Sequence, residues 1–237
     1  DTVELHNGTG QPVDLTGWFL TDDLEKPTKA PLSGTILPGA YQIFSGASVP
    51  GLNSRGETLY LYHGPILVDT VAWGPQIPGF TIGRIGPGGK WSLTYPTFGA
   101  ANQRAGTAPV RDLRINEWLA AFDVRYGSEF VELYNPGDSP APLGGLWISD
   151  SPDQPRRYQV PPLSFIAPRG FVTFRPATES TPDPGDLPFT LDAFREWIVL
   201  SDAAGARIDQ VPLVCLHPDL TEGRNPDGSD HLETFPL

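Results

Sequence analysis

The stretch "VELYNPGDSPAPLGGLWISD" (residues 131–150) closely repeats the stretch "VELHNGTGQPVDLTGWFLTD" (residues 3–22). The two align without a gap and share Val, Glu, Leu, Asn, Pro, Leu, Gly and Asp at matching positions. Further matches follow in the same order: "LPGAYQIF" with "APRGFVTF", an Asp-x-Val motif at Asp69 and Asp209, and a Gly-Arg pair ending at Arg84 and Arg224. A repeat of about the length of a domain predicts two similar domains rather than a solenoid.

Short segments rich in β-branched and aromatic residues run through the whole chain. Examples are "AYQIF", "TLYLY", "FVTF" and "WIVL", and they are separated by Pro-Gly, Asn-Pro and Asp-Gly turn signals. No segment has a convincing helical period. The 237 residues include 27 Pro and 26 Gly, and 39% of them are hydrophobic, which suits many short strands around packed cores. The sequence therefore predicts an all-β protein made of two tandem β-sandwiches.

The predicted domains are residues 1–103 and 112–237, joined by a linker at residues 104–111. The second copy opens with the segment "LRINEWL" (residues 113–119), whereas only Asp1 and Thr2 precede the repeat in the first copy. We therefore predict that the first sandwich lacks its first strand, that the second is truncated at its C-terminal end, and that the chain is a piece of a longer polypeptide. A missing strand leaves backbone groups unpaired, and a strand from elsewhere can fill such a gap.

These ordered motifs resemble the lamin-tail domain, an immunoglobulin-like β-sandwich that bacteria repeat in large secreted and surface proteins. The resemblance rests on Val-Glu-Leu at residues 3–5 and 131–133, Gly-Trp at 17–18, Ile-Asn-Glu at 115–117, the Gly-Arg pairs, and residues 96–102. It covers nearly the whole chain apart from the linker. The resemblance implies two immunoglobulin-like domains with a structural or interaction role.

Six polar positions recur in both copies and supply the candidate structural or interaction residues. An Arg with a carboxylate can form a bidentate pair between distant strands, and Asn or Asp can fix turns. Retention in both copies favours such scaffolding. The candidates are Glu4, Asn7, Asp22, Glu57, Asp69, Arg84, Glu132, Asn135, Asp150, Glu196, Asp209 and Arg224.

Core and turn positions are also predicted from the repeat. Gly17 and Gly145 are expected where the backbone turns tightly. Large aromatic side chains dominate small cores, and we expect four tryptophans to fill the two sandwiches. These are Trp18, Trp73, Trp147 and Trp197.

A search for chemistry finds no nucleophile elbow, no zinc-protease motif, no Cys-x-x-Cys and no phosphate-binding loop. The sequence therefore predicts no enzyme, no catalytic residues, no cofactor and no metal site. Calcium at the recurrent carboxylates remains an alternative, because hard cations bind oxygen ligands, although no Asp-rich loop has a recognisable spacing. A second alternative is a metal held by His217, Asp219 and His231.

The search also considered one cysteine and one glycosylation pattern. The one cysteine, Cys215 in "VPLVCL", is expected to be a small buried hydrophobic residue. Asn7-Gly8-Thr9 has the pattern of a glycosylation acceptor, which would matter only in a secretory pathway.

The balance of 16 basic and 28 acidic residues gives a formal net charge of −12 without a basic cluster, which argues against nucleic-acid binding. No apolar run reaches the roughly 18–20 residues that span a bilayer, so direct membrane insertion is not expected. The leading hypothesis is a structural or adhesive module pair of an extracellular or cell-surface protein, with a filament as the expected kind of assembly. Its partners would be copies of itself or neighbouring modules of the same polypeptide, joined by strand or edge complementation. The alternative is the accessory binding region of a secreted hydrolase, such as a nuclease, whose catalytic domain lies outside this chain.

Overall fold

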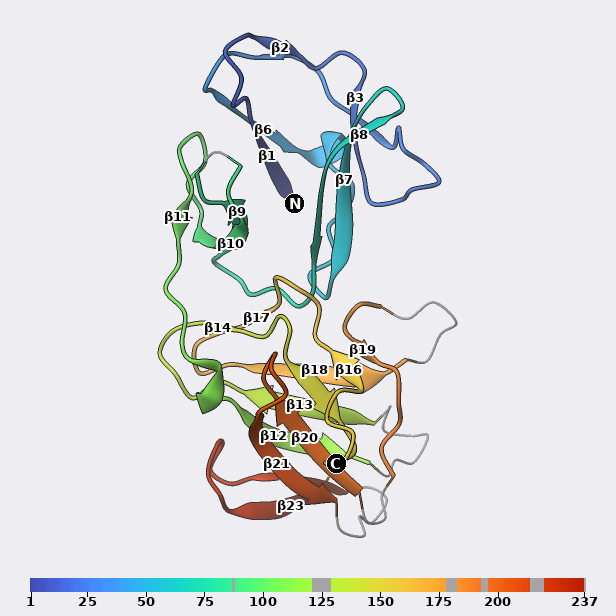
Figure 1. Cartoon of the computed structure of the whole chain (residues 1–237), viewed down its shortest axis with the longest axis vertical. Helices are drawn as coiled ribbons and strands as arrows, with labels where there is room; N and C mark the ends of the chain where they lie inside the picture. The colour runs from blue at the N-terminus through green and yellow to red at the C-terminus, as the bar shows by residue number, and fades with distance from the viewer. Residues whose placement is uncertain (87, 121–128, 178–182, 193–195, 214–219, 237) are drawn as a thin grey trace. The chain divides into compact units, whose positions relative to one another are not determined.

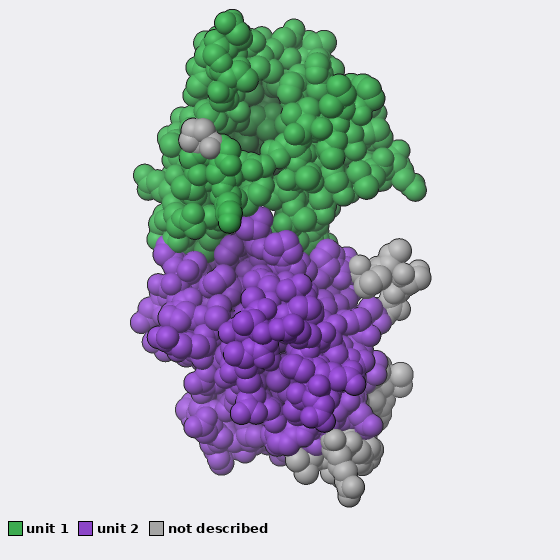
Figure 2. Space-filling view, in the orientation of Figure 1, with its two compact units in different colours: residues 1–73, 78–105 green, residues 74–77, 106–237 purple. Residues whose placement is uncertain are grey.

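A computed structural model describes the chain except for residues 87, 121–128, 178–182, 193–195, 214–219 and 237 (Figure 1). The chain divides into two compact units. Unit 1 comprises residues 1–73 and 78–105, and unit 2 comprises residues 74–77 and 106–237 (Figure 2). Cys215, His217 and Asp219, which the sequence singled out, lie outside the described residues.

Strands form almost all of the regular structure, so the prediction of an all-β protein is confirmed. The helical turns in the described ranges are two 3₁₀ segments of three residues each, η1 (Gly46–Ser48) and η2 (Val110–Asp112). No helix among the described residues is long and apolar enough to cross a membrane.

Unit 2 has one large sheet with the strand order β19-β18-β13-β12-β22-β23. Every neighbouring pair in it is antiparallel except β18 and β19, which run parallel. The strands are β12 (Arg114–Leu119), β13 (Phe130–Tyr134), β18 (Phe171–Pro176), β19 (Asp186–Leu187), β22 (Leu220–Arg224) and β23 (Leu232–Pro236).

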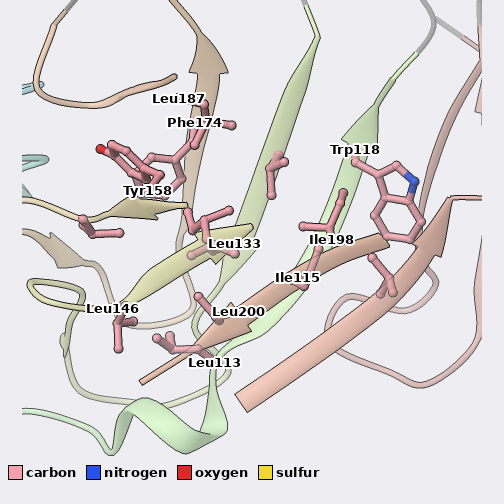
Figure 3. Packing of buried hydrophobic residues seen from close by; sticks show 14 of the residues in the cluster. Leu113, Ile115, Trp118, Leu133, Leu146, Tyr158, Phe174, Leu187, Ile198 and Leu200 are labelled. Carbon is pink, nitrogen blue, oxygen red and sulfur yellow. The ribbon is translucent and has the colours of Figure 1, made fainter. Parts of the chain in front are cut away.

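A second sheet of unit 2 has the order β16-β15-β20-β21, and a two-stranded ribbon pairs β14 with β17. The strands are β14 (Ala141–Pro142), β15 (Trp147–Ser149), β16 (Tyr158–Gln159), β17 (Phe165–Ile166), β20 (Glu196–Ser201) and β21 (Arg207–Leu213). One buried cluster takes side chains from both sheets, with Ile115, Trp118 and Leu133 on the large sheet and Ile198 and Leu200 on the smaller one (Figure 3). The two sheets therefore form a sandwich, and β12 supplies part of its core.

Unit 1 repeats this pairing without a counterpart of β12. Strand β1 pairs with β6, β9 pairs with β10 and β10 with β11, and the remaining sheet has the order β4-β3-β7-β8, with a separate β2–β5 ribbon. The strands are β1 (Thr2–His6), β2 (Val13–Asp14), β3 (Trp18–Thr21), β4 (Ala30–Pro31), β5 (Thr35–Ile36), β6 (Tyr41–Ser45), β7 (Glu57–His63), β8 (Ile66–Trp73), β9 (Thr81–Arg84), β10 (Trp91–Tyr95) and β11 (Gln103–Arg104). Where unit 2 has one continuous sheet, unit 1 has two separate pieces.

Gly17 and Gly145 occupy the same turn in the two units and have φ angles of 80° and 86°. Such left-handed backbone disfavours residues with a Cβ atom, so the expected tight turns are confirmed at both positions. In unit 1 the backbone carbonyl of Gly17 also accepts a hydrogen bond from Gly64 at the β7–β8 turn. The repeated glycine therefore reflects a repeated backbone geometry.

The tryptophan prediction is only partly correct. Trp73 is buried, and Trp18 and Trp147 are half-buried, whereas Trp197 on β20 is 39% exposed and does not fill the core. Trp118 on β12 is fully buried and was not among the predicted core residues. Successive residues of a strand point to opposite faces, so a tryptophan beside core positions such as Ile198 faces outward.

Because β12 has no counterpart among the described residues of unit 1, equivalent core residues should contribute unequally to the free energy of unfolding of the two units. Leu133 on β13 is fully buried, whereas Leu5 on β1, its counterpart in the repeat, is half-buried. We expect Leu133→Ala to destabilise unit 2 by about 3 kcal/mol. Leu5→Ala should destabilise unit 1 by roughly half of that or less, because less apolar surface is lost from the interior.

Hydrogen exchange measured by mass spectrometry across a urea series would resolve this difference, with β13 reporting on unit 2 and β1 on unit 1. Equal losses in the two units would contradict an incomplete core in unit 1.

Candidate functional site

Strand β12 lies between β13 and β22 and runs antiparallel to both. It pairs Ile115 with Leu133 and Trp118 with Val131 on one side, and Trp118 with Glu222 on the other. The register with β13 shifts between Ile115 and Glu117. β12 is therefore the strand that joins the two halves of the large sheet.

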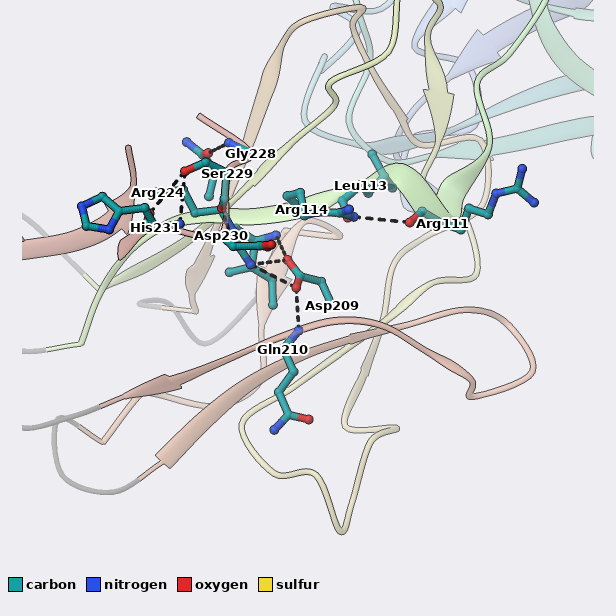
Figure 4. Close-up of polar contacts among 12 residues, drawn as sticks. Arg111, Leu113, Arg114, Asp209, Gln210, Arg224, Gly228, Ser229, Asp230 and His231 are labelled. Atoms are coloured by element: carbon teal, nitrogen blue, oxygen red, sulfur yellow. Dashed lines mark hydrogen bonds and ion pairs between the residues drawn. The ribbon is translucent and has the colours of Figure 1, made fainter. Parts of the chain in front are cut away.

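An ion pair in unit 2 holds the backbone of β12 at a single residue (Figure 4). Arg224 Nη2 lies 3.1 and 3.0 Å from the two carboxylate oxygens of Asp209. The amide of Ile115 donates to Asp209 Oδ2 over 2.8 Å, and the carbonyl of Ile115 accepts from Arg224 Nε over 2.7 Å. The pair thus satisfies both backbone groups of one residue on the neighbouring strand.

The loop after β22 completes this arrangement. Arg224 Nη1 donates to the carbonyl of Ser229, and the side chain of Asn116 bonds both Asp227 Oδ1 and the amide of Gly228, each over 3.0 Å. The side chains of Arg224 and Asp209 are only 6% and 13% exposed. A buried pair of this kind needs its remaining hydrogen bonds filled, and β12 and the loop fill them.

Unit 1 has the same pair without the strand. Arg84 Nη2 lies 2.6 Å from Asp69 Oδ1, and Arg84 Nη1 donates to the carbonyl of Gly89, which corresponds to Ser229. The guanidinium also lies 4.3 Å from the ring centre of Trp91. The side chains of Arg84 and Asp69 are 37% and 43% exposed. The Asp69–Arg84 pair is therefore formed, but it is exposed to solvent where β12 covers its counterpart in unit 2.

We call the unpaired edges of β1 and β9, the strands that correspond to β13 and β22, the open edge of unit 1. Among the described residues each of the two strands is paired on one side only, β1 with β6 and β9 with β10. The space-filling view shows a hollow in unit 1 near the part where β1 and β6 are drawn (Figures 1 and 2). Glu4 of β1 accepts a hydrogen bond from the amide of Gly99 over 2.6 Å, which ties β1 to the segment that follows β10. Apart from the carbonyl of Arg84, which accepts a hydrogen bond from Asn102 over 2.9 Å, the open edge presents strand backbone that no other strand pairs, the usual binding site for an added strand.

Apolar side chains that β12 covers in unit 2 are more exposed in unit 1. Leu133, Leu200 and Val211 are buried, whereas their counterparts Leu5, Leu61 and Val71 are half-buried. Val68 is 47% exposed, whereas its counterpart Ile208 packs against the core. The open edge therefore combines unpaired backbone with apolar surface.

The other recurrent residues hold loops in the same way in both units. The amide group of Asn7 donates to the carbonyls of Gln11 and Ile36, each over 2.8 Å, and Asn135 does the same to Ser139 and Ala167. Asn7 is buried and both of its amide hydrogens are used, which argues against glycosylation at the Asn7-Gly8-Thr9 pattern.

Asp22 and Asp150 each pair with a basic residue seven positions later. Asp22 accepts from Lys29 over 2.5 Å, and Asp150 accepts from Arg157. The sequence analysis did not select Lys29 or Arg157, although their equal spacing from the two aspartates was visible in the repeat. These pairs close equivalent loops, and none of their residues belongs to β1 or β9.

Glu57 and Glu196 are the first residues of β7 and β20, and each accepts a hydrogen bond from a backbone amide four residues earlier. The amide of Asn53 donates to Glu57 over 3.0 Å, and the amide of Asp192 donates to Glu196 over 2.5 Å. Burial raises the pKa of both carboxyl groups, against the opposing effect of these hydrogen bonds. The structure thus brings Asp69 with Arg84, and Asp209 with Arg224, into pairs, and gives the remaining candidates separate structural contacts.

No group of three or more His, Cys, Asp or Glu side chains among the described residues could hold a metal ion. His231 is an exposed residue whose ring nitrogen lies 2.9 Å from Glu233. The central contact of the site was not predictable from residue types, because the Asp209–Arg224 pair binds the backbone of Ile115 rather than a side chain.

These features define an immunoglobulin-like β-sandwich in which a charged pair recognises the backbone of a strand. Comparison with known families agrees: the model of the Lamin Tail Domain family matches residues 106–214, which lie in unit 2. This similarity supports a lamin-tail domain there and a binding or structural module rather than a catalytic one. Comparison with curated proteins gives no match.

The different burial of the two ion pairs leads to a direct test. Arg224→Ala would leave the Asp209 carboxylate and the Ile115 carbonyl buried without their partner, and we expect a loss of about 3–5 kcal/mol in unit 2. Arg84→Ala removes an equivalent but exposed pair and should cost unit 1 about 0–1 kcal/mol. Urea unfolding followed by hydrogen exchange in β22 and β9 would measure both losses of stability. Similar losses in the two units would argue against the conclusion that β12 shields the Asp209–Arg224 pair from solvent.

Glu132 on β13 gives a second test, in pH. Burial raises the pKa of Glu132 from its ordinary value of 4.5; the hydrogen bond from Asn116 opposes the rise, and the charges of Glu117 and Asp227 add to it. The folded state then binds the proton more tightly than the unfolded state, so unit 2 should gain stability as the pH falls from 7 toward about 5. Glu132→Gln should raise stability at pH 7 by a fraction of the roughly 1.4 kcal/mol that one pKa unit represents, and should flatten the pH dependence.

Asp153→Asn is the matched control for Glu132→Gln, because Asp153 is exposed in the same unit and the change in net charge is the same. Thermal unfolding between pH 5 and pH 7 would measure both variants. A pH dependence that Glu132→Gln leaves unchanged would count against this assignment.

Proposed function

We propose that the chain is a non-catalytic structural or adhesive module pair of a larger extracellular or cell-surface protein, with two lamin-tail-like domains in tandem. Its units assemble by strand complementation, with copies of the chain or with neighbouring modules of the same polypeptide. The observation that carries this proposal is the open edge of unit 1, because the same place in unit 2 is filled by β12.

The tandem part of the proposal is supported by contacts that recur in the two units. Thr21 and Ser149 close equivalent loops through their hydroxyl groups, Thr21 onto the carbonyls of Asp23 and Lys26, and Ser149 onto those of Ser151 and Gln154. Backbone pairing of β2–β5 and β3–β7–β8 corresponds to that of β14–β17 and β15–β20–β21. This correspondence supports the proposal that unit 1 is a second domain of the kind that the Lamin Tail Domain model matches in unit 2.

Assembly through the open edge follows from two physical properties. Unpaired strand edges bind other strands readily, and exposed apolar side chains such as Val68 and Leu61 gain stability when covered. Acidic residues reduce indiscriminate association, and the formal net charge of −12 favours a specific partner over aggregation. Two further parts of the proposal, the extracellular or cell-surface location and the larger parent protein, rest on the resemblance to lamin-tail modules that bacteria repeat in secreted and surface proteins.

Self-association of the purified chain tests the assembly part. Ile82 on β9 lies on the open edge, and Ile82→Lys should weaken the association constant at least about tenfold, because a charge there opposes strand addition. Ile66→Lys is the matched control, since Ile66 is 64% exposed at the β7–β8 turn of the same unit. Light scattering after size exclusion, over a range of concentrations, would give the masses.

Association that is equally strong with Ile82→Lys and Ile66→Lys would contradict assembly at this edge. A chain that stays monomeric at every concentration would exclude copies of the chain as the source of the strand and leave neighbouring modules of the same polypeptide.

A further inference from the structure

We propose that the open edge of unit 1 is a specific site for an extended segment of the β12 type, and that Asp69 and Arg84 bind the peptide groups of one apolar residue in it. This inference deepens the function proposed above and rests on it. The occupant is a free segment that resembles residues 113–119, "LRINEWL", rather than a second folded copy of the chain.

The hydrogen-bonding groups of the Asp69–Arg84 pair match those used in unit 2. The amide of Thr70 donates to Asp69 Oδ1 as the amide of Gln210 donates to Asp209 Oδ1, over 2.8 and 2.9 Å. In unit 2, Oδ2 of the aspartate accepts the amide of Ile115 and Nε of the arginine donates to its carbonyl. Among the described residues, Asp69 Oδ2 and Arg84 Nε have no hydrogen-bond partner. The two free positions are the two that β12 occupies.

The site is already arranged for binding. Arg84 is held by the carbonyl of Gly89, by Asp69 and by the ring of Trp91, so its guanidinium has a fixed orientation before any strand arrives. Preorganised groups lose little conformational entropy on binding. Asp69 and Arg84 should therefore bind an incoming strand without moving themselves. The side chain of Asn102, which donates to the carbonyl of Arg84 over 2.9 Å and lies against Gly83, would have to move aside.

The side chains around the pair determine which residues fit. The residue that takes the place of Ile115 would pair with Leu5 and meet the half-buried Leu61 and Val71, so an aliphatic side chain is favoured. The residue that takes the place of Trp118 would lie beside Val3 and Ile82, where unit 2 has Val131 and Glu222. An apolar or aromatic residue suits this more apolar position better than a charged one.

One contact of unit 2 has no equivalent in unit 1. Asn116 bonds Asp227, and the matching position in the repeat is Pro87, a residue outside the described ranges that has no carboxylate. The asparagine should therefore contribute less to binding in unit 1 than the apolar residue before it.

A second folded copy cannot easily supply this segment. In unit 2, Ile115 and Trp118 are both fully buried, and β12 pairs on both sides. Releasing β12 would open the core of the donor and leave the Arg224–Asp209 pair without its strand. A segment that is not already part of a folded sandwich binds without this cost.

A capped synthetic peptide of residues 111–120, "RDLRINEWLA", tests the proposal with the full chain. We expect saturable binding at one peptide per chain, measured by calorimetry, and conversion of any self-associated chain to a peptide-bound monomer. The same peptide with an N-methyl group on the Ile115 nitrogen cannot donate to Asp69 and should bind at least about tenfold more weakly. A peptide of the same composition in scrambled order should not bind.

Variants of the chain provide the second arm. Asp69→Ala and Arg84→Leu should each weaken peptide binding at least about tenfold. Asp22→Asn is the matched control, because it removes another carboxylate paired with a basic side chain in unit 1, away from β1 and β9. Circular dichroism of each variant shows whether unit 1 is still folded, and the N-methylated peptide tests the same contact with the unaltered chain.

The outcomes separate this inference from the proposed function. Peptide binding that is unaffected by N-methylation and by both variants would overturn the role of Asp69 and Arg84 but leave strand addition intact. No peptide binding, together with self-association that Ile82→Lys weakens, would make a second copy the occupant and overturn the inference alone. No peptide binding and no self-association would overturn both.

Discussion

The structure depends on one strand that must satisfy two neighbours at once. In unit 2, β12 forms backbone hydrogen bonds with β13 and β22, and its inward residues close the core between the two sheets. Each backbone hydrogen bond adds only about 1 kcal/mol net, because water bonds an exposed edge nearly as well. The larger contribution is the apolar surface of residues such as Leu133 and Val211, which unit 1 leaves partly exposed at Leu5 and Val71.

The Asp–Arg pair differs from the apolar core, because the pair forms both in unit 2, where β12 buries it, and in unit 1, where it is exposed. A buried ion pair is favourable only when its remaining donors and acceptors are filled, and in unit 2 the peptide groups of Ile115 fill them. In unit 1 solvent reaches Asp69 and Arg84 and can fill the same positions. The pair therefore exists with or without the strand, whereas the core is complete only with it. This separation lets unit 1 keep its geometry while it remains open.

The repeat made much of the fold predictable. Matching segments placed the strands, Gly17 and Gly145 were expected at tight turns, and the unmatched residues 113–119 indicated the strand absent from the first copy. The recurrence of Asp69 with Arg84 and of Asp209 with Arg224 suggested an ion pair between strands, which the structure contains in both units. Only in unit 2 does the arginine contact both oxygens of the carboxylate. The ligand of that pair could not be predicted, because it is a backbone group whose position depends on the register of β12. The exposure of Trp197 was missed for a related reason, since a single-residue shift along a strand reverses the face on which a side chain lies.

The open edge of unit 1 carries charged groups that oppose indiscriminate pairing. Glu4 projects from β1 and is held by the amide of Gly99, which places a carboxylate beside the unpaired backbone. Asp69, next to Arg84, supplies a second carboxylate. Charged residues at strand edges disfavour pairing with arbitrary strands. Because the Asp69 carboxylate and the Arg84 guanidinium can bond a correctly placed amide and carbonyl, the groups that repel a wrong strand also bind the right one, and selectivity arises without an additional recognition element.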